Sequence, residues 1–322
     1  MLKKTPFEQN IIAVIWDFDR TLIPEYMQEP VFEYYNVDGR MFWAEVNGLY
    51  EEYEKQGIKV NKDTIYINHF LTCIKQGIFK GLNNKLLREL GEKLEFYNGM
   101  PEFLQKIKSR IEDDENFKRF NITLEHYIIS TGFVEMIKGS AISKYVDGIW
   151  GCEFIERPIL SKLEIKEYKA VQEGKPEITQ IGYALDNTSK TRAIFEINKG
   201  SNFSKDIEVN DTMSLESRRI PFDKMIYIAD GPSDVPVFSL LRQNGGKTYA
   251  IYPKGNERAF AQVDELLRNK RVDSYGEADY SEGSQTYMWL MHHAAKIAES
   301  IYRAKDEQIK SSVSKSPRHL TD

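Results

Sequence analysis

The chain has 322 residues, of which 41% are hydrophobic and 29% are charged, the composition of an ordinary folded protein. This length suggests two domains, or one domain with large insertions. The net charge of −5 and the pI of about 5.7 give no electrostatic basis for binding nucleic acid.

The cysteine content and the hydropathy of the chain bear on its compartment. Cys73 and Cys152 lie far apart and have no metal-ligand or redox spacing, so buried thiols in a reducing cytosol are expected. The first residues lack the apolar region and small-residue cleavage site of a signal peptide. No uncharged apolar run approaches the length of a membrane span. We therefore expect a cytoplasmic protein with no membrane partner.

The first predicted element is a strand over Ile11 to Trp16, because this run is short, apolar and rich in β-branched residues. Asp17 and Asp19 follow it directly. Open α/β sheets bind ligands outside the carboxyl ends of their strands, so both carboxylates lie where a site is expected. In the simpler alternative, Asp19 caps a turn and Asp17 only ends the strand.

Residues 25–96 are predicted to form a helical block between the first strand and the next one. A loop with Pro24 and Pro30 leads into the segment, and apolar residues then recur at three- and four-residue steps, as at Phe42, Val46 and Tyr50. The block divides a core made of residues 1–24 and 97–310. A polar tail, residues 311–322, follows the core.

The second predicted strand runs from Ile122 to Ser130 and stops at Ser130-Thr131-Gly132, before a helix. Such a strand end offers a hydroxyl and free backbone N–H groups to an anion. Alternatively, Ser130 and Thr131 merely cap the helix.

The region that follows, residues 150–186, alternates weakly in polarity and predicts a β-hairpin insertion. Its two expected strands are Leu160 to Val171 and Glu177 to Leu185. The hairpin is interpreted either as an edge flap of the sheet or as a small second cap.

A helix is predicted from about Asn187, with Lys190 in its first turn. The helix dipole disfavours a cation at that end, so Lys190 requires an anionic ligand or a neighbouring carboxylate. Arg192 and Lys199 are rival candidates for the same role. Lys199, at the other end of the helix, is explained by the dipole alone.

A further apolar strand, Lys224 to Ala229, ends in Asp230-Gly231-Pro232-Ser233-Asp234. Gly231 and Pro232 favour a tight turn that can direct both carboxylates to one point. Acidic residues are thus predicted at the ends of two strands.

Taken in order, these motifs resemble those of the haloacid dehalogenase-like (HAD) phosphohydrolases, and of the phosphoserine phosphatase-like branch in particular. The resemblance implies an α/β fold with a Rossmann-like core, in which a parallel sheet is flanked by helices. It also implies that residues 25–96 form a helical cap, inserted after the first strand, that closes over the active site. Arg20 is a departure, because many members have Gly or Ser there; it either contacts substrate or points at solvent.

The resemblance assigns a role to each motif residue. It implies Mg²⁺ as cofactor, Asp17 as the nucleophile that forms an aspartyl-phosphate, and Asp19 as general acid and then base. Asp234 binds the metal through water or holds the lysine. The implied catalytic residues are Asp17, Asp19, Ser130 and Lys190; the substrate contacts are Arg20, Thr21, Thr131 and Gly132; and the metal ligands are Asp17, Asp19 through its backbone carbonyl, Asp230 and Asp234.

The expected function is a Mg²⁺-dependent phosphatase acting on a small phosphorylated metabolite. An acid at Asp19 favours phosphoryl transfer, because the dehalogenases of the superfamily lack it. The alternatives are a phosphomutase or other phosphotransferase, and a non-catalytic phosphate-binding or interaction module on a HAD scaffold. Substrate specificity is expected to reside in the helical cap.

Overall fold

A computed structural model describes residues 7–159 and 174–313 of the chain. Its strands are β1 (Ile11–Trp16), β2 (Thr123–Phe133), β3 (Gly148–Ile155), β4 (Gln180–Tyr183), β5 (Met225–Ala229), β6 (Lys247–Tyr252) and β7 (Ser274–Glu277). They form one seven-stranded sheet with the order β4-β3-β2-β1-β5-β6-β7. All neighbours are parallel except β3 and β4, which are antiparallel. Without β4, the chain order of the parallel strands is 3-2-1-4-5-6, that of a Rossmann-like sheet, as the sequence predicts.

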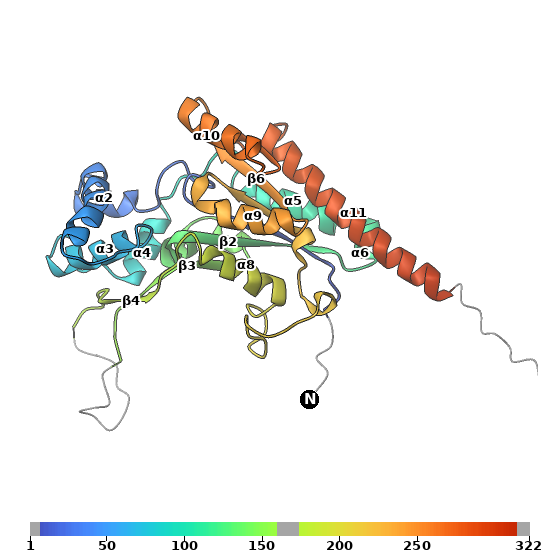
Figure 1. Cartoon of the computed structure of the whole chain (residues 1–322), viewed down its shortest axis with the longest axis horizontal. Coiled ribbons are helices and arrows are strands. Elements are labelled where there is room, and N and C mark those ends of the chain that lie inside the picture. The colour runs from blue at the N-terminus through green and yellow to red at the C-terminus, as the bar shows by residue number, and fades with distance from the viewer. Residues whose placement is uncertain (1–6, 160–173, 314–322) are drawn as a thin grey trace, which may run out of the picture.

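Helices cover both faces of this sheet, and the first four of the described helices form the predicted helical block (Figure 1). The described helices are α1 (Glu29–Tyr35), α2 (Gly39–Lys55), α3 (Ile65–Lys75), α4 (Asn84–Gly91), α5 (Glu102–Glu112), α6 (Glu115–Lys118), α7 (Val134–Gly139), α8 (Lys190–Lys199), α9 (Val235–Gln243), α10 (Glu257–Arg268) and α11 (Gln285–Val313). α5 packs with α11 on one face, and α8 packs with α9 on the other (Figure 1). This division follows from the right-handed crossovers between parallel strands. The chain crosses the sheet in one direction from β1 to β2 and in the opposite direction from β5 to β6, so the connecting helices lie on opposite faces.

The core of the molecule centres on β1 and β5. Every residue from Ile12 to Trp16 is completely buried, and so are all residues of β5. Buried β-branched and aromatic side chains on both faces explain why these runs form central strands. No helix in the described ranges is long and apolar enough to cross a membrane, the 29-residue α11 included.

α1 to α4 occupy the predicted helical block, and α2, α3 and α4 gather at one end of the molecule, beside β3 and β4 (Figure 1). The block has an aromatic interior: the ring of Phe32 lies 4.9 Å from that of Phe42 and 5.9 Å from that of Phe70. Backbone bonds also attach it to the core, as Ile178 N donates to Leu82 O at 2.8 Å. Its definition as a separate cap domain remains a prediction.

Two glycines allow α4 of this block to contact α7 of the core. A Cβ at Gly91 would clash with the backbone carbonyl of Met136, and a Cβ at Gly139 would clash with that of Arg88. The two helix backbones therefore touch directly, and an ion pair between Arg88 and Glu135 lies beside the contact. This end of the block is firmly seated on the core.

β2 is longer than the sequence predicts. It continues through Ser130 and does not end until Phe133, and α7 starts at Val134. The strand continues because it pairs with β3 on both sides of a register shift, between Ile129 and Phe133. Such an irregularity bends a strand and redirects its side chains, and here it lies in the predicted anion-binding segment.

The region in which the sequence predicts a hairpin contains one antiparallel pair, β3 and β4. β3 is also a strand of the main sheet, because it pairs in parallel with β2. The connection over residues 160–173, which includes the whole of the expected strand from Leu160 to Val171, lies outside the described residues.

Candidate active site

The predicted acidic residues meet at the point where the sheet order reverses. From β1 the chain fills one side of the sheet with β2 and β3, and it later fills the other side with β5, β6 and β7. Ligands of open α/β sheets bind at the carboxyl strand ends beside such a reversal. Asp17 follows β1 and Asp230 follows β5, and Asp17 N donates to Ile228 O at 2.9 Å. The two strand ends therefore lie side by side.

Asp17, Asp230 and Asp234 form an acidic cluster. One carboxylate oxygen from each lies within 4.8 Å of the other two. Asp234 joins the cluster because a 3-10 turn, Pro232–Asp234, leads the chain from β5 into α9. The Asp19 carboxylate lies outside the cluster and accepts a hydrogen bond from Met27 N at 2.9 Å. Only the backbone carbonyl of Asp19 was expected to bind metal.

Lys190 lies between two of the clustered acids. Its Nζ donates to Asp17 Oδ1 and to Asp234 Oδ1, both at 2.7 Å, and its side chain is only 2% exposed. Thr21 Oγ1 donates to the other Asp17 oxygen at 3.0 Å. α8 begins at Lys190, three residues later than predicted, so Lys190 is in its first turn as expected. The two carboxylates supply the negative charge that this position requires. The rival candidate Arg192 is exposed and pairs with Glu196.

Burial raises the pKa of three acids here, Asp17, Asp19 and Asp230. It raises the pKa of Asp17, against the opposing charge of Lys190, and it raises the pKa of Asp230 together with the charge of Asp17. Burial and the neighbouring Asp17 also hold the pKa of Asp19 well above its usual range. Burial opposes the charged form of Lys190, but Asp17 and Asp234 outweigh it and raise the lysine pKa. One ammonium thus faces three clustered carboxyl groups, which leaves excess negative charge for a cation to neutralise.

The predicted anion-binding segment lies on the neighbouring strand. The register pairs Trp16 with Ile128, so Ser130 is placed just past the end of β1. Ser130 is buried, and its hydroxyl accepts from Gly132 N at 2.9 Å. A Cβ at Gly132 would clash with the Met27 Cε atom, so the end of the Met27 side chain would have to move to admit it.

A cleft of about 620 Å³ lies beside the acids. Asp19, Arg20 and Tyr26 line it from the segment after β1, Trp43 lines it from α2, and Thr131 from β2. Of the predicted substrate contacts, Arg20 and Thr131 therefore face this cleft, whereas Thr21 is buried against Asp17.

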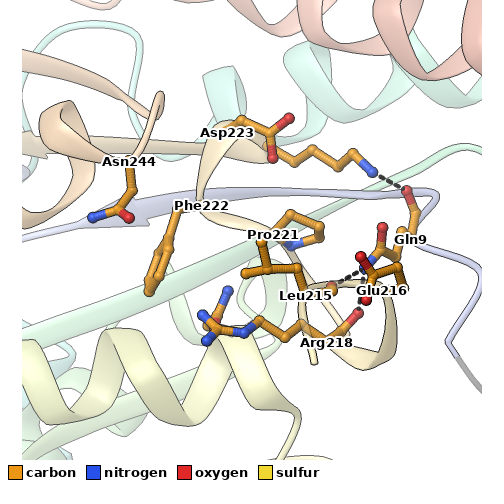
Figure 2. A pocket seen from close by; sticks show the side chains of 10 residues that line it. Gln9, Leu215, Glu216, Arg218, Pro221, Phe222, Asp223 and Asn244 are labelled. Atoms are coloured by element: carbon orange, nitrogen blue, oxygen red, sulfur yellow. Dashed lines mark hydrogen bonds between the residues drawn. The ribbon is translucent and has the colours of Figure 1, made fainter. Parts of the chain in front are cut away.

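A second pocket, of about 320 Å³, lies at the opposite ends of the strands (Figure 2). Gln9 and Lys224, two of the residues that line it, precede β1 and β5. The Gln9 amide donates to Leu215 O at 2.7 Å and to Arg218 O at 3.1 Å, and Lys224 Nζ donates to Gln9 O at 2.8 Å. These bonds attach the loop before β5 to the N-terminal segment, and no predicted site residue lines this pocket.

Several residues that support the site were not predicted from the sequence. The Tyr227 hydroxyl donates to Asp234 Oδ1, and Ser233 Oγ donates to Asp234 Oδ2 at 2.9 Å. The Tyr280 hydroxyl donates to Thr21 O at 2.6 Å, across 259 residues of sequence. Tyr227 belongs to an apolar strand and looks like an ordinary core residue. Ser233 could have been found from the sequence, because it lies between Pro232 and Asp234 in the predicted tight turn.

The strand order, with Asp17, Lys190, Asp230 and Asp234 converging at its reversal, defines the HAD-like fold that the sequence motifs imply. No known protein-family model matches the chain. The chain belongs to the same family as an uncharacterised protein of Borreliella burgdorferi, to which it is 38% identical over 287 residues. The match spans 88% of this chain and 96% of the relative.

The solved structures that resemble the chain are distant. A HAD-family hydrolase from Salmonella enterica serovar Typhi is 15% identical with a TM-score of 0.49, covering 85% of this chain and 69% of the other. A probable phosphoserine phosphatase from Vibrio cholerae is 13% identical with a TM-score of 0.46, covering 92% and 68%. At this distance the likenesses add no argument, and the fold assignment depends on the chain's own strand order and site.

Proposed function

We propose that the protein is a Mg²⁺-dependent phosphatase that hydrolyses a small phosphomonoester through an aspartyl-phosphate on Asp17. The main support is the environment of Asp17: Lys190 and Thr21 each hold one of its oxygens, next to Asp230 and Asp234. A carboxylate oriented in this way, beside further acids and a buried ammonium, suits nucleophilic attack on phosphorus and not a purely structural role.

The residues present fit a hard divalent cation. Three carboxylates within 4.8 Å of one another offer the oxygen ligands that Mg²⁺ prefers, and one lysine does not balance their charge. Asp17 and Asp230 would hold the ion through carboxylate oxygens, with the Asp19 backbone carbonyl, while Asp234 holds Lys190. Once bound, the ion would neutralise the repulsion between the Asp17 carboxylate and an anionic substrate.

In the first half-reaction, an oxygen of Asp17 forms a bond to phosphorus as the ester P–O bond breaks. Asp19 donates its proton to the departing oxygen, which leaves as an alcohol. Its raised pKa suits this task, because burial and the nearby Asp17 favour the protonated form of the carboxyl group. The products are the aspartyl-phosphate and the Asp19 carboxylate.

In the second half-reaction, water attacks the phosphorus of the aspartyl-phosphate and Asp19 accepts the proton of that water. The bond from phosphorus to the Asp17 oxygen breaks, and inorganic phosphate leaves. Lys190, the Ser130 hydroxyl and the N–H groups near Gly132 are proposed to stabilise the phosphoryl oxygens while their charge redistributes. Both carboxyl groups return to their starting states.

We further propose that the helical block of residues 25–96 is the cap of this site. Trp43 from α2 lines the cleft, and Tyr66 from α3, which lines it too, donates a hydrogen bond to Thr131 O. The block therefore supplies much of the lining of the cleft that Asp19 also lines. A small phosphorylated metabolite of the cytoplasm would fit this arrangement, since a cleft of this volume holds a compact ligand.

The test is hydrolysis of 4-nitrophenyl phosphate with Mg²⁺ by the wild type and by Asp17→Asn, which keeps the shape of the side chain but not its nucleophilicity. The wild type should release inorganic phosphate, and the variant should not. Asp113→Asn is the matched control, because Asp113 is exposed at the end of α5. Wild-type activity in Asp17→Asn would refute the proposal.

Product analysis separates the alternatives. A phosphatase releases equal amounts of alcohol and inorganic phosphate, whereas a phosphotransferase releases less phosphate than alcohol when an acceptor hydroxyl is present. A non-catalytic module would release neither, although it would still bind phosphate.

A further inference from the structure

On the proposed reaction, the position of the leaving group is determined by the nucleophile. In-line attack by Asp17 places the departing oxygen on the far side of phosphorus. Asp19, the proposed proton donor to that oxygen, lines the 620 Å³ cleft. The leaving group therefore extends into this cleft, and Lys190 stays on the phosphoryl side.

Arg20 enters this cleft from a costly backbone conformation. Its φ is +59°, in the left-handed region that most side chains avoid and glycine adopts freely. Strained residues of this kind persist where the surrounding structure or the function requires them. A glycine would relieve the strain, whereas the arginine at this position places a guanidinium beside the cleft.

The guanidinium of Arg20 is held by an aromatic ring and not by an acid. It lies 4.8 Å from the ring centroid of Tyr26, which in turn packs 5.2 Å from the ring of Trp43. Among residues 7–159 and 174–313, no carboxylate oxygen lies within 4.0 Å of its nitrogens. Stacking of this kind fixes the cation in place while its N–H donors stay available.

A second cation of the cleft has the same arrangement. Lys62, in the connection between α2 and α3, lies 3.9 Å from the ring centroid of Tyr50. It too has no carboxylate within 4.0 Å in the part of the chain that the structure describes. Two cations from separate segments, each held by a ring, therefore line the space assigned to the leaving group.

The same cleft also contains acids, which either bond to other residues or would oppose the binding of an anion. Asp63 accepts a hydrogen bond from Asn187 N at 3.4 Å. Glu25 and Glu29 also line a neighbouring pocket together with Glu33. These glutamates would favour a cationic leaving group instead, so an ammonium-bearing probe belongs in the test.

Resting on the proposed phosphatase function, we propose that Arg20 is a specificity-determining residue that binds a second anionic group, a carboxylate or a second phosphate, on the leaving group of the substrate. Bidentate binding by a planar guanidinium suits either anion. Lys62 adds positive charge to the same cleft from another segment.

The test compares kcat/KM for three two-carbon phosphomonoesters that differ in one group: 2-phosphoglycolate, ethyl phosphate and 2-aminoethyl phosphate. The wild type should prefer 2-phosphoglycolate over ethyl phosphate by about tenfold or more, as expected for a charged hydrogen bond. In Arg20→Gln this ratio should fall to near one, and Arg20→Glu should favour 2-aminoethyl phosphate. Because each ratio is taken within one variant, it does not depend on the fraction of folded enzyme.

Arg40→Gln is the matched control, since Arg40 lines the same cleft but is almost fully exposed and lies near Asp38. It should leave the ratio unchanged. The proposal is overturned if the wild type shows no preference or prefers 2-aminoethyl phosphate, or if Arg20→Gln slows all three substrates equally, as a phosphoryl-binding residue would. If 4-nitrophenyl phosphate is hydrolysed while these ratios fail, only this proposal falls; if no phosphomonoester is hydrolysed, the proposed function falls with it.

Discussion

The Lys190 ammonium lies 2.7 Å from Asp17 Oδ1, although 173 residues separate the two in sequence. The sheet order explains the meeting, because α8 precedes β5 and β5 lies directly beside β1. Because the contact is buried, water cannot solvate its charges. Removing one partner of such a pair should therefore cost more than the loss of a surface ion pair.

Lys190→Met should destabilise the protein by about 3–5 kcal/mol at pH 7, because Asp17 and Asp234 would then be buried without a countercharge. The cost should shrink toward pH 5, because burial raises the pKa of Asp17 to about 6 and its carboxyl group is protonated there. Urea unfolding at both pH values measures the effect. Arg192→Met, an exposed pair on the same helix, should cost no more than about 1 kcal/mol. A cost that small for Lys190→Met would contradict the buried-pair interpretation.

The acids and the lysine of this site were predictable from the sequence because each lies at a recognisable boundary. Apolar β-branched runs end at Asp17 and Asp230, and a cation in the first turn of a helix stands out at Lys190. These are local signals, and parallel strands bring their ends together whenever the strands are neighbours. Chain order and element type brought the acids together, and the resemblance to the HAD motifs favoured Lys190 over its rivals Arg192 and Lys199.

Features that depend on pairing between distant segments could not be predicted in this way. The extension of β2 past Ser130 exists because β3 pairs beyond a register shift, and one strand alone carries no sign of it. In the sequence Tyr227 could not be distinguished from a core residue, because the hydrogen bond from its hydroxyl to Asp234 depends on how the turn after β5 folds. The left-handed backbone of Arg20 could not be predicted either, because an arginine in a sequence gives no indication of a positive φ.

Asp19→Asn should separate the two half-reactions of the proposed mechanism. 4-Nitrophenolate leaves without a proton, so the variant should still release about one nitrophenol per active site in a rapid burst. Turnover should then stall, because the water that attacks the aspartyl-phosphate lacks its base. Stopped-flow absorbance detects the burst.

An alkyl phosphate supplies the contrast for Asp19→Asn. Its alkoxide needs a proton, so the variant should lose about 10²–10⁴-fold in the first step and show no burst. Equal losses on aryl and alkyl phosphates would argue against Asp19 as the acid. Asp113→Asn should behave as wild type on both substrates.

Metal binding should reverse the pH dependence of stability. Burial raises the pKa of Asp17 to about 6 and that of Asp230 to about 7, against an ordinary value of 3.8. The metal-free folded state therefore binds more protons than the unfolded state between about pH 4 and pH 7, and the free energy of unfolding should fall as pH rises through this window. Mg²⁺ binds the ionised carboxylates, so at 100 times its Kd it should restore about 2.7 kcal/mol at pH 8.

Thermal unfolding in EDTA and in Mg²⁺, from pH 5 to pH 8, tests this expectation. Asp230→Asn should flatten the slope in EDTA and abolish the response to Mg²⁺, since it removes both a titrating group and a ligand. Asp113→Asn should change neither. A wild type that is as stable in EDTA as in Mg²⁺ at pH 8 would exclude a metal at the cluster.

Gly91→Ala should weaken the attachment of the helical block to the core. The added methyl would clash with Met136 O in α7, and backbone cannot rotate away as a flexible side chain can, so we expect a loss of about 1–3 kcal/mol. Gly48→Ala, in the interior of α2, is the matched control: its added methyl meets nothing within 4 Å, and the change should stabilise the protein by up to about 1 kcal/mol. Urea unfolding of the two variants measures the expected loss of stability in Gly91→Ala and the expected gain in Gly48→Ala. If Gly91→Ala were as harmless as Gly48→Ala, α4 would not be seated on α7 in solution, and the cleft wall that the block supplies would have to be held by other contacts.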